Sequence, residues 1–290
     1  MTFSLEERHE RRFNVNGRLM AARCWHDSNK PPILALHGWL DNAATFDLLA
    51  PQLSDYYIVA LDFAGHGYSA HRPQGARYHL VDHVDDVLAV VKQLGWQKFS
   101  LMGHSMGAGI AALFAAAMPE LIDKVVMIEG FGPYTGKHED AVQHLRLALN
   151  EWQQFDDSPR VISSFEVAIK ARMNGLLPVG EQAARLLCAR GTKVFADGLM
   201  WSTDKRLRLS SPTRFSEQQV CAYLAAIEAP TLLIMAEKTL PFHVGDYQQR
   251  IAAHRHLQLV KLAGGHHLHV DDNVEGVVTE VKQFLQERFL

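Results

Sequence analysis

The stretch Phe99-Ser100-Leu101-Met102-Gly103-His104-Ser105-Met106-Gly107 decides the fold of this chain. It opens with a short, mostly apolar run that is typical of a buried strand, and residues 110–117 after it are rich in alanine and predict a helix. Glycines at positions 103 and 107 allow a tight passage between the two, because side chains would clash there. The sequence therefore predicts a strand, a sharp turn that carries Ser105, and a helix.

Similar apolar runs recur on both sides of this stretch. They occupy residues 33–36, 57–61, 99–102, 125–128, 231–235 and 257–262. Continuous apolar runs of this length are typical of strands buried on both faces of a parallel sheet. Segments with helical spacing of apolar residues separate these runs, for example residues 80–94 before Gly95. The turn pair Asn16-Gly17 indicates a β-hairpin at the start of the chain. The pattern predicts a doubly wound, mostly parallel α/β fold.

The alternation of strands and helices is interrupted in the second half of the chain. Residues 131–226 are rich in Leu, Ala, Arg and Gln at helical spacing and show no convincing strand. Such an insertion cannot join the sheet, so we expect it to lie over the carboxyl ends of the strands, where open α/β sheets bind ligands. The predicted domains are a core of residues 1–130 and 227–290 and a helical cap of residues 131–226.

Composition excludes several classes of protein. The formal net charge of -3 over 290 residues lacks the basic excess of nucleic-acid-binding proteins, and no stretch reaches the roughly 18 apolar residues of a membrane span. The opening MTFSLEERHERRF carries charge where a signal peptide needs an apolar segment, and the three scattered cysteines indicate neither a disulfide framework nor a zinc site. We expect a cytoplasmic monomer or homodimer with no nucleic-acid partner and no membrane insertion.

Ser105 is the predicted nucleophile. The turn raises it above the sheet edge at a helix N-terminus, where the backbone favours negative charge. Its hydroxyl needs a base, and His266 is the first choice because Gly264-Gly265-His266 follows the last apolar run and returns to the same edge. His267 and His269 are its competitors. We expect no metal in this cluster, which lacks the helical H-E-x-x-H spacing, and no cofactor.

Four motifs together resemble the α/β-hydrolase superfamily over nearly the whole chain. They are His37-Gly38-Trp39, the run from Leu61 to Ser69 (LDFAGHGYS), the Ser105 turn and Gly265-His266. Within the superfamily, the run HGWLDN at 37–42 together with the Ser69 loop looks most like the serine hydrolase-like proteins. The resemblance implies an oxyanion hole made by the backbone N–H groups of Trp39 and Met106. For Asp62 and His66 we expect loop stabilisation.

The acid partner of His266 departs from the superfamily pattern. Most members carry an aspartate after the strand that follows the insertion, but Ala236-Glu237-Lys238-Thr239 places an uncharged threonine there. Glu129, at the end of the strand before the insertion, resembles the acid of certain haloalkane dehalogenases. A carboxylate that ends an otherwise apolar strand also needs a partner for its charge. We favour Glu129 and keep Glu237 as the alternative.

The substrate is predicted from side chains near the strand ends and in the insertion. The predicted substrate contacts are Trp39, His104, Phe131, Tyr134 and Phe242. Arginines 146, 172, 185 and 190 of the insertion offer an alternative contact to a substrate carboxylate, but we expect them to be solvated, as charged helix faces usually are. The sequence predicts hydrolysis of a small to medium apolar carboxylic ester through a Ser-His-acid triad. A lactonase, a carbon–carbon hydrolase and a ligand-binding protein with a weak triad are the alternatives.

Overall fold

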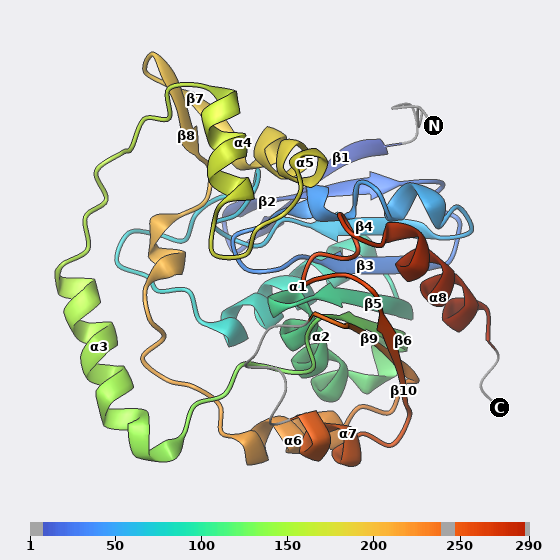
Figure 1. The fold of residues 1–290 in the computed structure, drawn as a ribbon. Coiled ribbons are helices and arrows are strands. Elements are labelled where there is room, and N and C mark those ends of the chain that lie inside the picture. Colours follow the sequence, from blue (N-terminus) through green and yellow to red (C-terminus); the bar gives the residue numbers. More distant parts are fainter. Residues whose placement is uncertain (1–7, 239–246, 288–290) are drawn as a thin grey trace.

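An eight-stranded sheet forms the centre of the computed structural model, which describes residues 8–238 and 247–287 (Figure 1). The strands lie in the order β1-β2-β4-β3-β5-β6-β9-β10. They are β1 (Arg8–Val15), β2 (Arg18–Trp25), β3 (Pro32–Leu36), β4 (Tyr57–Leu61), β5 (Phe99–His104), β6 (Ile122–Ile128), β9 (Thr231–Ala236) and β10 (Leu257–Leu262). Strands β4, β3, β5, β6, β9 and β10 are parallel to one another. Strand β1 is antiparallel to β2, and β2 is antiparallel to β4. The predicted fold is confirmed.

Burial explains why the apolar runs form these strands. Every residue of β4, β5 and β9 is buried, as expected for central strands that are covered on both faces. The edge strand β10 mixes half-buried and exposed residues instead.

Helices cover both faces of the sheet. One face carries α1 (Leu80–Leu94), α2 (Met106–Ala117), α6 (Glu217–Ala225) and α7 (Tyr247–Ala253), which share one hydrophobic cluster with the strands. The other face carries α8 (Val274–Gln286) and the short 3-10 helix η2 (Ala43–Phe46). Helix α1 spans the predicted residues and ends at Gly95, whose φ of 71° suits glycine. Among the described residues, no helix is long and apolar enough to cross a membrane.

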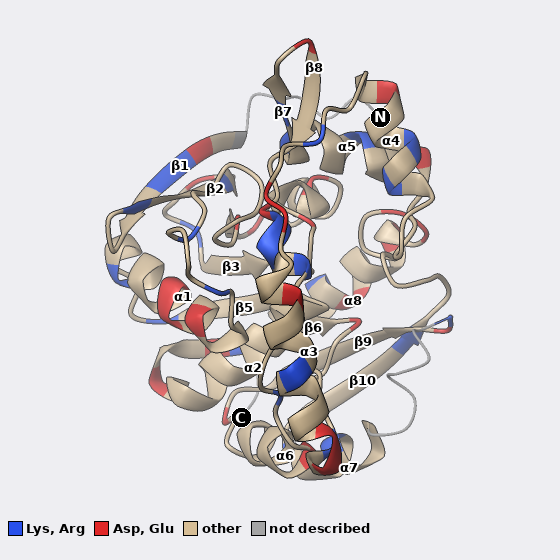
Figure 2. Ribbon diagram, turned by 90° about the vertical axis from the view of Figure 1, so that its left-hand side faces the viewer, with Lys and Arg blue, Asp and Glu red and all other residues tan. Residues whose placement is uncertain are grey.

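The segment between β6 and β9 lies outside the main sheet. It contains α3 (Ala141–Gln153), α4 (Phe165–Met173), α5 (Glu181–Gly191), the 3-10 helix η6 (Lys205–Arg208) and α6. In Figure 1, α4 and α5 lie at the top of the molecule, and α3 lies on the left, away from α8; Figure 2, which views that left-hand side, shows α3 in front of the sheet. Helix α6 instead packs on α2, with Val220 and Leu224 in the core cluster. By packing, α6 therefore belongs with the core helices.

The expectation that the insertion contains no strand is wrong. Strands β7 (Thr192–Phe195) and β8 (Gly198–Trp201) form an antiparallel hairpin, which Ala196 closes with a φ of 49°. Each strand has four residues, too few for an alternating pattern to stand out from the helical spacing around it.

Candidate active site

Ser105 lies on the strand-to-helix turn that the sequence predicts. Strand β5 ends at His104, Ser105 has φ 51° and ψ -113°, and α2 begins at Met106. A Cβ at Gly103 would lie 2.5 Å from the carbonyl oxygen of Gly107, and a Cβ at Gly107 would overlap the carbonyl oxygen of Leu36. Only glycine fits both positions, and the turn thereby presents the Ser105 hydroxyl at the edge of the sheet.

Strand register brings Glu129 to the same edge. Ile128 pairs with His104 on one side and with Ile234 on the other, so the next residue, Glu129, lies between the ends of β5 and β9. Glu129 is completely buried, and its Oε1 accepts a hydrogen bond from the Ala236 amide at 2.5 Å.

Ser105, His266 and Glu129 form a continuous line of polar contacts. The His266 Nε2 lies 3.0 Å from the Ser105 Oγ, and its Nδ1 lies 3.2 Å from the Glu129 Oε2. Because a carboxylate accepts hydrogen bonds, the proton belongs on Nδ1, which leaves the Nε2 lone pair to accept from the serine hydroxyl. This tautomer suits proton transfer from Ser105.

The other candidates for the acid and the base lie elsewhere. Glu237 is exposed, and its amide donates to the Leu262 carbonyl. The His267 Nε2 lies 3.1 Å from the Asp41 Oδ2, and the His269 Nε2 lies 2.8 Å from the Thr45 Oγ1. Thr239 lies outside the described residues. Among the described residues, the structure brings Glu129 and His266 to Ser105.

Comparison with known proteins places the chain in a family. Residues 31–273 match the model of the alpha/beta hydrolase fold family. The chain belongs to this family. It is 32% identical to a serine hydrolase-like protein of Danio rerio, over 92% of this chain and 85% of that one, and 31% identical to serine hydrolase-like protein 2 of Homo sapiens, over 92% and 90%. A solved hypothetical protein of Pseudomonas aeruginosa PAO1 is 40% identical with a TM-score of 0.87, over 95% of this chain and 97% of that one.

The loop after β3 holds the first expected oxyanion donor of this α/β hydrolase. Leu40 has a φ of 63°, the Asp41 amide donates to the Gly38 carbonyl at 3.2 Å, and the Trp39 indole Nε1 donates to the Leu207 carbonyl of η6 at 2.9 Å. The other expected donor, the Met106 amide, lies in the first turn of α2, where amides have no carbonyl partner within the helix. The oxyanion role of both amides stays a prediction.

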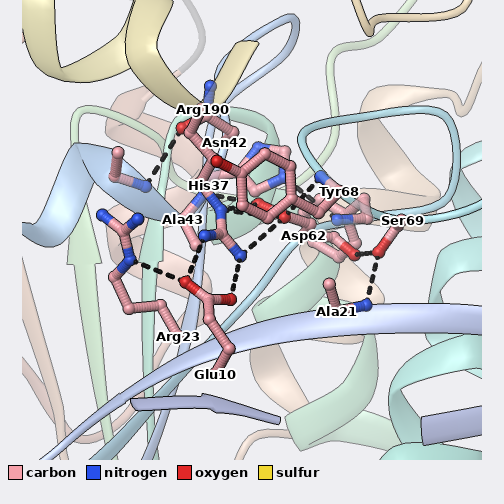
Figure 3. Close-up of polar contacts among 12 residues, drawn as sticks. Glu10, Ala21, Arg23, His37, Asn42, Ala43, Asp62, Tyr68, Ser69 and Arg190 are labelled. Atoms are coloured by element: carbon pink, nitrogen blue, oxygen red, sulfur yellow. Dashed lines mark hydrogen bonds and ion pairs between the residues drawn. The ribbon is translucent and has the colours of Figure 1, made fainter. Parts of the chain in front are cut away.

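Asp62 stabilises the loops beside the site, as the sequence predicts. Its two oxygens accept from the amides of Ala43 and Tyr68, each at 2.8 Å (Figure 3). Arg190, at the end of α5, also donates to both oxygens, at 3.0 and 2.9 Å, and its guanidinium reaches Glu10 at 2.6 and 2.9 Å. The expectation that Arg190 is solvated is wrong, because the buried Asp62 carboxylate requires a cationic partner.

Two predicted substrate contacts are interior residues. His104 and Phe131 have no exposed surface, so water-sized molecules do not reach them. Phe131 packs against Tyr247 and His254. The predicted contacts at both positions are wrong. His104 ends β5 and Phe131 follows β6 at the active edge, but both side chains are buried in the protein interior.

The remaining predicted substrate contacts differ in exposure. Trp39 is half-buried, whereas Tyr134 is 59% exposed, with the Arg214 guanidinium 4.8 Å from the centre of its ring. Phe242 lies outside the described residues.

His104 contacts the backbone and the ring of the predicted base, His266. Its Nε2 donates to the His266 carbonyl oxygen at 2.8 Å, and its ring centroid lies 4.8 Å from that of His266. Burial lowers the pKa of His104 well below its ordinary value, so the ring is uncharged at neutral pH. Sequence reasoning missed this role because it depends on a carbonyl 162 residues away.

Asp41, His104 and His267 have the composition of a metal site. Their nearest ligand atoms lie within 4.8 Å of one another, and all three residues are buried. The Arg172 guanidinium, however, approaches the Asp41 Oδ1 at 2.9 Å and the His267 Nε2 at 3.2 Å. A second cation there would be repelled by this fixed positive charge.

Proposed function

We propose that the protein is a serine hydrolase that cleaves small to medium apolar carboxylic esters through an acyl-enzyme on Ser105. The observation that carries the proposal is the contact line from Ser105 through His266 to the buried Glu129, on a strand-to-helix turn, in a member of the α/β-hydrolase fold family. A serine hydroxyl requires such a base, and the base requires a group that orients it.

The proposed reaction has two halves. Ser105 Oγ attacks the ester carbonyl carbon while His266 Nε2 takes its proton, and the amides of Trp39 and Met106 stabilise the oxyanion. As the tetrahedral intermediate collapses, His266 returns the proton to the leaving alkoxide and an alcohol departs. Water then attacks the acyl-enzyme with His266 as base, which releases the carboxylic acid and restores Ser105. Glu129 stabilises the imidazolium in both halves.

An apolar substrate is supported by the cap residues next to the base. His266 lines a cavity of about 350 Å³, which has one apolar wall, formed by Leu176, Leu177 and Val179 of the loop between α4 and α5, and a charged part formed by Lys238, Asp271 and Asp272. A volume of this size is within the range of small-molecule sites, which are mostly apolar with a few polar groups. Apolar side chains beside a polar reacting centre favour an ester with an alkyl or aryl group.

Covalent labelling tests the proposal directly. A fluorophosphonate should modify Ser105 in the wild-type protein and leave Ser105→Ala unmodified. Hydrolysis of p-nitrophenyl esters from acetate to octanoate should fall by about 10³-fold or more in the variant, since loss of the nucleophile removes covalent catalysis. If folded wild-type protein is neither labelled nor active, the proposal fails and a ligand-binding role is favoured.

A further inference from the structure

A buried carboxylate lies in the loop that carries the Trp39 amide. Asp41 is almost completely buried, and its two oxygens have different partners: Oδ1 lies 2.9 Å from Arg172 Nη2, and Oδ2 lies 3.1 Å from His267 Nε2. Burial raises the pKa of this carboxyl, but the neighbouring His267 and Arg172 outweigh burial and hold the pKa well below its ordinary value. The group is therefore charged at neutral pH.

Arg172 connects three segments that are distant in sequence. It lies in the last turn of the cap helix α4, and its guanidinium contacts Asp41, His267 and the carbonyl of Leu177. Arg172 is half-buried, in contrast to the solvated side chain that the sequence predicts. Asp41 belongs to the loop of the oxyanion donor and His267 adjoins the base, so one cap side chain contacts both.

The space between the two loops is filled. A Cβ on Gly38 would lie 2.8 Å from the His104 Nδ1, so the oxyanion loop packs directly on His104. The same ring holds the His266 carbonyl through its Nε2. A shift of the oxyanion loop is therefore transmitted to the base, because close-packed groups cannot move independently.

We propose that Arg172 is a positioning residue: by holding Asp41 and His267 from the cap, it keeps the Trp39 amide and the His266 ring aligned for the same transition state. The inference rests on the proposed function. It adds that the reaction requires the cap to be docked on the core, because Arg172 of the cap is a cation that pairs with Asp41.

Kinetics of three variants test this role. Arg172→Met should lower kcat for p-nitrophenyl butyrate by about 10- to 100-fold with KM within about threefold, since misplacement by about 1 Å costs up to that much in rate. Arg172→Lys, which keeps the charge, should recover part of the loss. Arg185→Met is the matched control, because Arg185 pairs with Glu166 and Glu181 on the exposed face of the cap. Its kinetics should equal those of the wild type.

A transition-state analogue separates positioning from general loosening. An alkyl boronic acid, which forms a tetrahedral adduct on a catalytic serine, should lose affinity for Arg172→Met in proportion to kcat/KM. If Arg172→Met instead weakens substrate binding by the same factor, so that KM rises while kcat is unchanged, the inference is overturned.

Hydrogen exchange gives a second readout that needs no activity. Amides of residues 38–42 and 265–268 should exchange faster in Arg172→Met than in Arg185→Met, because both segments lose the same anchor. Unchanged exchange in both segments overturns the inference even if the protein proves inactive. Unchanged kinetics of Arg172→Met in a labelled, active enzyme overturns it while the proposed function stands.

Discussion

Two residues of the candidate site have backbone conformations that L-amino acids rarely adopt. Ser105 has a φ of 51° and Glu129 a φ of 49°, and such positions cost about 1–3 kcal/mol each. Hydrogen bonds hold both backbones: the Ser105 amide donates to the Ile128 carbonyl and the Glu129 amide to the Ile234 carbonyl, each at 2.9 Å. Strain at two adjacent strand ends is expected where side-chain direction matters more than local stability.

The strongest residue-scale prediction concerns the acid. Glu129→Gln should lower kcat for ester hydrolysis by about 10³- to 10⁴-fold, because an amide neither stabilises the imidazolium nor fixes the Nδ1–H tautomer of His266. Glu237→Gln, on the exposed surface, should stay within about twofold of wild type. Both rates would be measured on proteins with matching circular dichroism. A large loss confined to Glu237→Gln would show that the acid is misassigned.

Polar contacts fasten the cap elements to the loops of the core. Besides Arg172 and Arg190, the Asp204 amide beside η6 donates to the Gly65 carbonyl at 2.8 Å, and the Tyr78 hydroxyl donates to the Asp204 Oδ2 at 2.7 Å. The loops after β3 and β4 both take part, and the loop after β3 packs on His104, the residue before Ser105. Elements that are fixed in this way position side chains more accurately than a mobile cover would.

Arg190 is the element-scale test of this attachment. Arg190→Met should lower the free energy of unfolding by about 3–5 kcal/mol, because it leaves the buried Asp62 carboxylate without its cation. Glu10→Gln should cost less than about 1 kcal/mol, since the Glu10 side chain is 42% exposed. Urea unfolding at pH 7.5, followed by circular dichroism, would measure both. Equal stabilities of the two variants would contradict a central role for the Arg190–Asp62 pair.

At the scale of the whole molecule, the sequence predicts what is local and misses what depends on distant packing. The Ser105 turn, helix α1 and the parallel strands follow from short motifs and from apolar runs. The sequence favours Glu129 over Glu237 as the partner of His266, but the geometry of that contact depends on the register of β6, β5 and β9, which no short motif encodes. For the same reason, the sequence does not show that Arg172 and Arg190 form ion pairs, because their carboxylate partners Asp41 and Asp62 lie at least 128 residues away in the chain. Helical spacing likewise did not show that α6 packs on α2.

The whole molecule should also be sensitive to mild acid. Five histidines are fully buried and have lowered pKa values, with burial as the largest cause: His37, His66, His83, His104 and His269. Burial brings the pKa of His37 to about 4 and that of His66 to about 3, from ordinary values of 6.5. Above pH 6.5 these rings are uncharged whether the chain is folded or unfolded. Below it, only the unfolded chain takes up the protons.

Stability should therefore fall as the pH drops from 6.5 towards 4, by up to about 1.4 kcal/mol per pH unit for each such histidine. Asp41 affects stability only at lower pH. Because its pKa is lowered in the folded protein, its stabilising contribution is lost only when the pH falls below 3.8, the ordinary pKa of the group. Urea unfolding at pH 7.5, 6.5, 5.5 and 4.5 would measure the slope, and His37→Gln should reduce it by about 1.4 kcal/mol per pH unit. Unfolding midpoints that stay constant from pH 7.5 to 5.5 would contradict the uncharged state of these rings, and with it the neutral support that His104 gives to His266.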